Sequence, residues 1–324
     1  MAYRKKLIIL SSIIAVLALV YVLTVFFEPE RAGARDSAFT WLDPGLKERI
    51  DRITLNSQGN LIELARNGGK WFVSREGKEY PAKDLRVDDF IAILGRKAPY
   101  PVRASSAAAH ERLGLAENDA SRITVSGGAG LPLLDLLVGA GDQTGREVYL
   151  RRQGGGEVRS GEDKFTAYIS GSALAWFNLR LFPESENGGL DIDGVQRVTV
   201  YASALSDSSA PEPQVFTRAG REWALSGVDV ENPDTGKIDA YVRGILNIEG
   251  DDFADSADAG APEFNAGRIA LELGDGSVKT IRLTAPDESN RRLAAVSGSP
   301  WVYSLSGWST ERLFREASFF EKEQ

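Results

Sequence analysis

The residues of this chain whose types and spacing could support chemistry are few, and the first group is a glycine-rich stretch. Residues 138–145 read VGAGDQTG after an apolar strand pattern, and they nearly match the dinucleotide-binding fingerprint G-x-G-x-x-G. The glycine spacing is wrong by one residue, and residues 147–151 predict a strand where the phosphate-binding helix would have to begin. We therefore interpret the stretch as a hairpin loop and predict no nucleotide and no other cofactor.

His110 is the only histidine, and it precedes the sequence Leu113-Gly114. A Ser-His-Asp site would require this imidazole, but no G-x-S-x-G elbow is present to supply the nucleophile. Metal sites built on several imidazoles are impossible, and the lack of cysteine excludes disulfides, thiolate zinc sites and cysteine nucleophiles. We interpret His110 as a solvated loop residue and predict no catalytic and no metal-binding residues.

Four carboxylates cluster in one acidic, alanine-rich loop between residues 249 and 262. Clustered carboxylates can bind calcium, but this loop lacks the D-x-[DN]-x-[DN]-G order that folds ligands around an ion. A solvated acidic loop is the favoured interpretation. The alternative is a charged contact surface for a basic partner, which makes the four residues candidate partner contacts: Asp251, Asp252, Asp255 and Asp258.

Trp71 and Trp223 could be ligand platforms, but they occupy the same place in two similar segments. A leucine follows each tryptophan after 23 residues, Leu94 in the first segment and Leu246 in the second. A residue tied to the same predicted strand twice indicates a packing role. We predict that these four residues form the core of a repeated unit and superpose pairwise.

The elements that must position these residues are also written twice. Each copy predicts three opening strands, a helix with apolar residues at i, i+3, i+4 and i+7, two further strands, and an amphipathic terminal segment. We expect residues 166–171 to form a tyrosine-bearing strand equivalent to residues 301–307. The predicted fold class is α+β, with one N-terminal transmembrane helix followed by two tandem repeats of antiparallel-rich sheet with packed helices.

The predicted boundaries follow from shifts in composition. A polar linker that contains Gly and acidic residues and follows Pro183 separates the two repeats. The expected organisation is a cytoplasmic tip and transmembrane anchor at 1–27, a juxtamembrane stem at 28–50, the first repeat at 51–183, the linker at 184–194 and the second repeat at 195–324.

Residues 7–27 are an uninterrupted run of 21 apolar or hydroxyl residues, which predicts a membrane span. Arg4 to Lys6 precede the run and acids follow it, so the N-terminus is expected in the cytoplasm of a bacterial inner-membrane protein and the bulk of the chain outside it. The alternative is a cleaved signal peptide with a mature form starting at Arg35. Trp41, beyond the span, is a candidate for an interfacial segment.

The balance of charge restricts the partners. The whole chain has a net charge of −8, and the part beyond the span is about −11 once Arg4, Lys5 and Lys6 are set aside. A phosphate-binding surface needs clustered Lys and Arg, whereas the basic residues here are scattered among a larger number of acids. We therefore expect no nucleic acid as a partner.

The order of elements resembles the bacterial domain of unknown function 4340 family. The residues that carry the resemblance are Trp71, Pro81-Ala82, the helix to Leu94, Leu113-Gly114-Leu115, Val138-Gly139, Val148-Tyr149-Leu150 and Tyr168 in the first copy, with Trp223, Tyr303 and Leu305-Ser306-Gly307 in the second. The second copy has no Gly-Leu step near Phe264. The resemblance implies an accessory role beside auxiliary components of gliding-motility-type ABC transporters, and it supplies no catalytic residues.

The function expected from these observations is a membrane-anchored extracytoplasmic binding or assembly module, not an enzyme. Its expected partners are the lipid bilayer, through the N-terminal helix, and an inner-membrane complex such as an ABC transporter permease or its auxiliary subunit. One alternative is a structural envelope scaffold without a transporter. The other is a hydrolase based on two carboxylates, because 46 acidic residues allow a pair that no short motif reveals.

Overall fold

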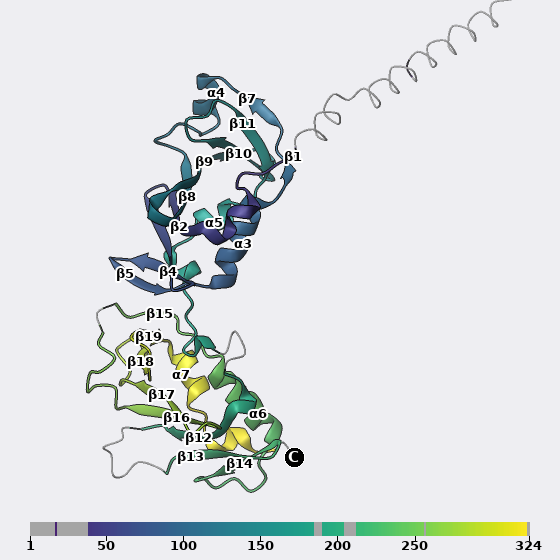
Figure 1. The fold of residues 1–324 in the computed structure, drawn as a ribbon. Helices are drawn as coiled ribbons and strands as arrows, with labels where there is room; N and C mark the ends of the chain where they lie inside the picture. The colour runs from purple at the N-terminus through teal and green to yellow at the C-terminus, as the bar shows by residue number, and fades with distance from the viewer. Residues whose placement is uncertain (1–16, 18–37, 185–189, 204–211, 256, 323–324) are drawn as a thin grey trace, which may run out of the picture. The chain divides into compact units, whose positions relative to one another are not determined.

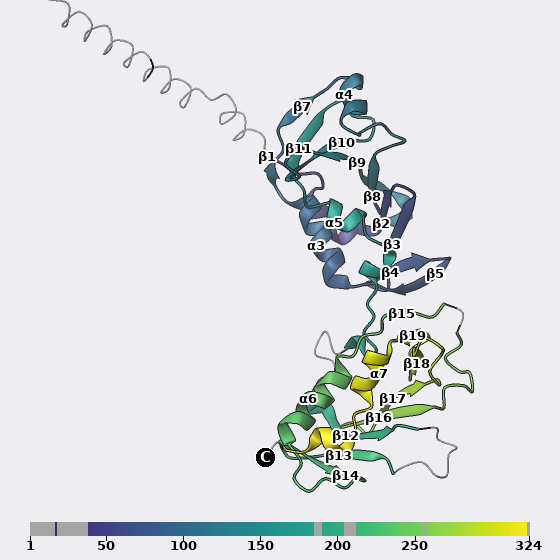
Figure 2. The same cartoon turned by 180° about the vertical axis from the view of Figure 1, so that it is seen from behind.

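The structure is a computed structural model that describes residues 17, 38–184, 190–203, 212–255 and 257–322 (Figures 1 and 2). The chain divides into two compact units, residues 1–177 and 178–324. Within the described residues, the structure contains no helix that combines the length and apolar character needed to cross a bilayer. Apart from Leu17, the predicted span at 7–27 lies outside the described residues.

Unit 1 is built on a nine-stranded sheet in which every described pair of neighbours is antiparallel. In spatial order the strands are β5 (Lys78–Pro81), β4 (Lys70–Arg75), β3 (Asn60–Asn67), β2 (Ile50–Ser57), β8 (Ser121–Gly127), β9 (Pro132–Gly141), β10 (Glu147–Arg152), β11 (Val158–Glu162) and β7 (Val102–Ala104). The helical segments are η1 (Pro44–Arg49), α3 (Asp84–Gly95), α4 (Ala107–Arg112), η2 (Gly128–Gly130), α5 (Thr166–Ile169) and η3 (Ala173–Trp176).

The core of unit 1 follows from the two periodicities of its sequence. Alternate residues of β2, such as Ile53 and Leu55, are fully buried on one face of the sheet. Helix α3 contributes residues at i, i+3, i+4 and i+7, which places one apolar stripe against the sheet. The buried residues of that stripe are Val87, Phe90, Ile91 and Leu94.

A short strand fastens the segment before unit 1 to its body. Strand β1 (Ala38–Phe39) pairs with β6 (Ala98–Pro99), and Trp41 packs edge-on against Phe39 and Tyr100 at centroid distances of 4.9 and 5.4 Å. The Arg152 guanidinium donates to the main-chain carbonyl of Trp41, which is only 2 % exposed. The expectation that Trp41 marks an interfacial segment is therefore wrong: its ring belongs to the aromatic core of unit 1.

Unit 2 repeats this plan with an eight-stranded antiparallel sheet. In spatial order the strands are β14 (Glu222–Ser226), β13 (Gln214–Ala219), β12 (Val195–Tyr201), β16 (Gly267–Leu273), β17 (Val278–Leu283), β18 (Arg292–Val296), β19 (Val302–Leu305) and β15 (Asp252–Phe253). The helical segments are η5 (Ile192–Gly194), α6 (Thr235–Leu246), α7 (Gly307–Leu313) and η6 (Ala317–Phe320). The α+β class is confirmed, with antiparallel sheets dominating both units.

The two sheets have the same strand order once β5, which has no counterpart among the described residues of unit 2, is set aside. Each order has its three opening strands at one end, and helices α3 and α6 follow those strands in sequence. The predicted strand at residues 166–171 is wrong, because Thr166–Ile169 forms the helical turn α5, whereas Tyr303 lies in β19. The strand that holds the place of β19 in unit 1 is β11, whose central residues Ser160 and Gly161 give no apolar signal.

Candidate functional site

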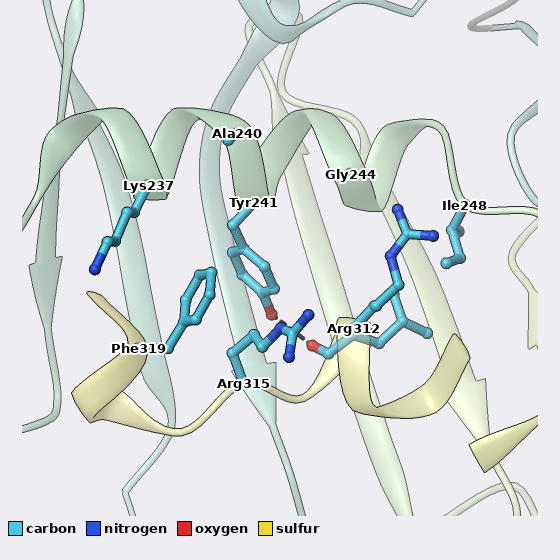
Figure 3. A pocket seen from close by; sticks show the side chains of 9 residues that line it. Lys237, Ala240, Tyr241, Gly244, Ile248, Arg312, Arg315 and Phe319 are labelled. Atoms are coloured by element: carbon cyan, nitrogen blue, oxygen red, sulfur yellow. Dashed lines mark hydrogen bonds between the residues drawn. The ribbon is translucent and has the colours of Figure 1, made fainter. Parts of the chain in front are cut away.

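The most distinctive hollow in unit 2 is a groove between α6 on one side and α7 and η6 on the other (Figure 3). Its volume is about 200 Å³. Three of its nine lining residues are cationic and none is acidic. The lining residues, called the α6–α7 groove below, are Lys237, Ala240, Tyr241, Gly244, Ile248, Arg312, Leu313, Arg315 and Phe319.

Helix α6 forms one wall because its ends and its faces are well specified. The Asp234 side chain caps the helix by accepting from the N–H groups of Gly236 and Lys237 at 2.9 and 3.1 Å. The face that includes Ile238 and Val242 is buried on the sheet. The adjoining face carries Ala240 and Gly244, four residues apart, so the wall that borders the groove has small side chains.

The opposite wall begins at a capped helix as well. Ser306 caps α7 by accepting from the Ser309 N–H at 3.4 Å, and its own N–H donates to the Asp251 carboxylate at 2.5 Å. Between the walls, Tyr241 donates from Oη to the main-chain carbonyl of Leu313 at 2.5 Å. Burial raises the pKa of Tyr241, although the positive charge of Arg315 opposes the rise, so the phenol stays a neutral donor at physiological pH.

The cations of the groove are held by aromatic rings. The Arg312 guanidinium lies 4.7 Å from the ring centre of Trp308, and that of Arg315 lies 4.9 Å from the ring of Phe319 (Figure 3 shows Arg312, Arg315 and Phe319). Within the part of the chain that the structure describes, neither arginine forms an ion pair or a side-chain hydrogen bond. Lys237 lies 6.0 Å from the Phe319 ring and donates to the carbonyl of Glu321 at 2.9 Å.

Two large apolar side chains remain exposed beside these cations. Trp308 is 66 % exposed and Phe319 is 40 % exposed, whereas Tyr241 and Leu313 at the floor are almost completely buried. The groove thus combines a recessed apolar floor, a rim of aromatic rings and two arginines with unused donors. Such a combination of Arg and aromatic side chains is typical of the central part of protein–protein contacts.

Gly244 borders the groove from the last turn of α6. A Cβ placed on this glycine would meet no atom within 4 Å, so its absence is not explained by close packing. Glycine inside a helix costs roughly 0.5–1 kcal/mol relative to alanine. The residue at the same count from the start of α3 in unit 1 is Ile93, which has a large side chain there.

Unit 1 uses the corresponding helix differently. Phe90 of α3 lies 5.9 Å from Trp176, as Tyr241 of α6 lies 5.1 Å from Phe320. The ring of Tyr168 packs on both Phe90 and Trp176, at 5.0 and 5.8 Å. Arg86 stacks on Tyr168 at 4.7 Å and donates to the Ala167 carbonyl at 3.1 Å, so this cation is occupied by its own unit.

A second hollow, of about 190 Å³, lies in unit 1 at the C-terminal end of α3. It contains the cations Arg96, Lys97 and Lys164, but Glu162 also lines it and pairs with Lys164 at 3.0 Å. Burial raises the pKa of Tyr100 in its wall, against a lowering hydrogen bond with Trp41. Because its charges are partly neutralised internally, this hollow is the weaker candidate for a binding site.

The near-fingerprint at residues 138–145 lies at the end of β9 and in the turn to β10. The Asp142 carboxylate accepts from the N–H groups of Arg146 and Glu147 and from the Thr144 hydroxyl at 2.6 Å. The Thr144 bond is the largest of the causes that lower the pKa of Asp142 to about 2. The stretch closes a β-hairpin, as the sequence predicts, and strand β10 follows it.

The glycine of the pair Val138-Gly139 has a packing role. A Cβ on Gly139 would lie 2.3 Å from the carbonyl oxygen of Leu113, and Gly114 adopts a φ of +68° against the N–H of Ala140. The Ala140 N–H donates to that Leu113 carbonyl at 2.9 Å. The segment Leu113-Gly114-Leu115 and the pair Val138-Gly139 therefore lie against each other in one close backbone contact.

His110 lies in the last turn of α4, where its Nε2 is 2.9 Å from the carbonyl oxygen of Gly156. It is half-buried and in a hydrogen bond, rather than fully solvated. Among the described residues, no group of three or more His, Asp or Glu side chains could hold a metal ion.

Three of the four loop aspartates accept hydrogen bonds from backbone N–H groups. The Asp251 carboxylate accepts from the N–H that begins α7, and the Asp252 carboxylate accepts from the Phe253 N–H at 2.7 Å within β15. Asp258 closes a turn by accepting from the Gly260 N–H at 2.8 Å, and Asp255 is half-buried. Two of the four are thus engaged in the edge strand and the α7 cap.

The predicted repeat-core residues occupy corresponding elements. Trp71 is the second residue of β4 and Trp223 the second of β14, with exposed fractions of 6 % and 3 %. Leu94 and Leu246 are buried at the ends of α3 and α6. Counted from the first residue of each helix, however, Leu94 corresponds to Ile245, one residue before Leu246.

The sequence does not predict the α6–α7 groove, because the residues that line it come from segments far apart in the chain. The only local signals were a glycine inside a helical pattern at Gly244 and the alternation of arginines with aromatic residues between Trp308 and Phe319. Neither signal specifies a site until α6 and α7 are placed side by side.

A family model described as a domain of unknown function (DUF4340) matches residues 71–266, more than half of the chain. The match begins at Trp71 in unit 1 and ends just before β16 in unit 2, so it follows neither unit alone. No curated protein and no solved structure matches the chain significantly.

Proposed function

This chain belongs to the DUF4340 family, and from that premise we propose that it is a membrane-tethered, non-catalytic module that binds and helps to assemble an envelope complex. The observation that carries the proposal is the α6–α7 groove. Its recessed floor, exposed aromatic rim and two arginines without ion pairs among the described residues suit a protein contact.

The tether in this proposal is residues 7–27. The support is the sequence itself, an apolar run long enough to span a bilayer with Arg4 to Lys6 on its cytoplasmic side. The remainder of the chain is then extracytoplasmic and consists of two tandem α+β repeats. The matching strand orders of the two sheets support a duplicated unit.

The partner in this proposal is an inner-membrane complex, with an ABC transporter permease or its auxiliary subunit as the first candidate. A structural envelope scaffold that contacts no transporter is the second. A carboxylate-based hydrolase is less favoured, because the groove is lined by three cations and no carboxylate. Binding of an acidic surface, rather than hydrolysis, is the chemistry that such a lining suits.

Photo-crosslinking in cells tests the groove as the contact site. A photoreactive residue at Trp308 should capture a membrane-complex subunit, and the product should be lost when Arg312→Glu and Arg315→Glu are added. Val278, which is 52 % exposed on β17, gives the matched control position and should capture little. Equal products at both positions, or products insensitive to the arginine changes, would overturn the proposal.

The identity of the captured subunit separates the two partner classes, since a permease supports the transporter role and a non-transport envelope protein supports the scaffold. Reporter fusions at the N-terminus and at Gln324 test the tether independently. They should report opposite sides of the membrane. Recovery of a soluble mature form beginning at Arg35 would replace the tether by a cleaved signal peptide.

A further inference from the structure

We infer that the α6–α7 groove recognises an acidic linear segment of a partner protein, with an apolar side chain seated over Gly244 and carboxylates paired with Arg312 and Arg315. This inference rests on the proposed function and specifies the chemistry of its contact. It follows from the size, the charge and the shape of the groove.

The size of the groove suits a side chain rather than a whole metabolite. Pockets that enclose small ligands are commonly about 300–1,000 Å³, whereas this groove has about 200 Å³. Its floor, formed by Tyr241 and Leu313, is almost fully buried and apolar apart from a phenol that is already bonded. An apolar anchor from a polypeptide would therefore be desolvated there without leaving a polar group unpaired.

The charge of the groove selects carboxylates. Arg312 and Arg315 are stacked on Trp308 and Phe319, so their planar N–H forks are held in place before a partner arrives. A guanidinium binds a carboxylate through two parallel hydrogen bonds. The chain has a net charge of −8, so this acid-free lining is a local exception that an acidic segment complements.

The openness of the groove is maintained at a cost in stability. Gly244 weakens α6, yet a Cβ at this position would meet nothing within 4 Å. With Ala240 one turn earlier, it leaves a smooth wall on which a partner backbone can lie close to the helix. The space above Gly244 is thus the seat of the anchor side chain.

A membrane surface fits these features less well than a peptide. Interfacial lipid binding uses a convex helix face whose apolar side chains protrude, whereas only Trp308 and Phe319 protrude here and the floor residues Tyr241 and Leu313 are recessed between two helices. Three cations also fall short of the clusters of about four to eight Lys or Arg residues that are typical of binding to anionic lipid. A single polypeptide segment can pair its carboxylates with both arginines and place an apolar side chain in the groove.

The test is peptide display on the full chain reconstituted in phosphatidylcholine nanodiscs. A random library is selected on the unmodified protein and on Gly244→Leu, whose side chain would fill the groove. Peptides recovered only by the unmodified protein should combine Asp or Glu with Leu, Phe or Trp. Enrichment of basic or uncharged peptides, equal recovery by Gly244→Leu, or no enrichment would overturn the inference.

Arginine variants provide the second arm. Arg312→Gln and Arg315→Gln should each weaken a synthetic copy of the enriched peptide by about tenfold in fluorescence anisotropy, while the exposed Arg291→Gln should leave it unchanged. Ala240→Leu repeats the filling test if Gly244→Leu unfolds. Co-sedimentation with phosphatidylglycerol vesicles that is lost in the same arginine variants, without peptide binding, would assign the groove to lipid instead.

The two proposals fail in different ways. If the display arm fails but crosslinking from Trp308 still depends on the arginines, the acidic segment is wrong and the contact module stands. If acidic peptides bind but Trp308 captures nothing in cells, the groove chemistry stands and the proposed function fails.

Discussion

The hydroxyl of Tyr241 donates to the main-chain carbonyl of Leu313 over 2.5 Å, and this bond joins the middle of α6 to the last residue of α7. Both residues are almost fully buried, so neither group has water as a substitute partner. The floor of the α6–α7 groove is thereby fixed by one polar contact inside an apolar layer.

Tyr241→Phe should lower the free energy of unfolding by about 1–3 kcal/mol, because it leaves the buried Leu313 carbonyl without this donor. Urea denaturation followed by circular dichroism measures the loss. Tyr149→Phe is the matched control, since its hydroxyl makes no hydrogen bond with the described residues of unit 1. An equal effect in both variants would show that the Tyr241 bond adds nothing.

Gly139→Ala should destabilise unit 1 by about 3 kcal/mol, because the new Cβ would lie 2.3 Å from the Leu113 carbonyl oxygen and the backbone would have to move. Gly141→Ala, on the same strand, is the control. Its new Cβ would lie 3.6 Å from the nearest atom, the carbonyl oxygen of Glu147, so the substitution should be tolerated. Thermal unfolding of the full chain measures both. A harmless Gly139→Ala would contradict the packing role of the Val-Gly pair.

Gly244→Ala should raise the free energy of unfolding by roughly 0.5–1 kcal/mol, since the methyl group meets no atom and the helix gains propensity. The reverse change one turn earlier, Ala240→Gly, should lower it by a similar amount. Chemical denaturation compares the pair. Destabilisation by Gly244→Ala would show that the space above this residue is not open.

Tyr303 should make unit 2 sensitive to alkali. Burial raises the pKa of Tyr303 to about 12, so above the ordinary tyrosine pKa of about 10 the unfolded state loses its proton first. The stability contributed by the neutral phenol is complete below pH about 10 and is lost as pH rises through about 12. Between these pH values the free energy of unfolding of the unmodified chain should fall by about 2 kcal/mol more than that of Tyr303→Phe. Urea titrations at several pH values measure both. Parallel losses would sink the prediction.

The regular part of the fold is predictable because its signal is local. Alternation at Ile53 and Leu55, and the i, i+3, i+4 spacing of Val87, Phe90 and Ile91, follow directly from the strand and helix periods. The segment 166–171 misled because Thr, Tyr and Ile favour strands, yet Tyr168 packs between Phe90 and Trp176, and that tertiary contact accompanies a helical turn.

The groove was not predictable for a different reason. Arg312 and Gly244 reveal nothing by their spacing, since they meet only after α6 and α7 dock on the same sheet. The acidic loop shows another limit of the sequence: its four aspartates look alike there, but the Asp251 carboxylate accepts a hydrogen bond from the N-cap residue of α7. The density of charged residues in a sequence does not reveal which of their side chains form hydrogen bonds within the folded chain.

If residues 7–27 span a bilayer, as proposed, the aromatic attachment of β1 limits how far from the bilayer unit 1 can lie. The rings of Phe39 and Trp41 pack against Tyr100, so the chain is attached to unit 1 from Ala38 onward. If the proposed span ends at Phe27, only residues 28–37 separate it from β1, and even a fully extended stretch of that length covers at most about 35 Å. Strand β1 would then lie within a few nanometres of the membrane surface. Unit 1 could therefore reach only partner surfaces that are close to the lipid headgroups.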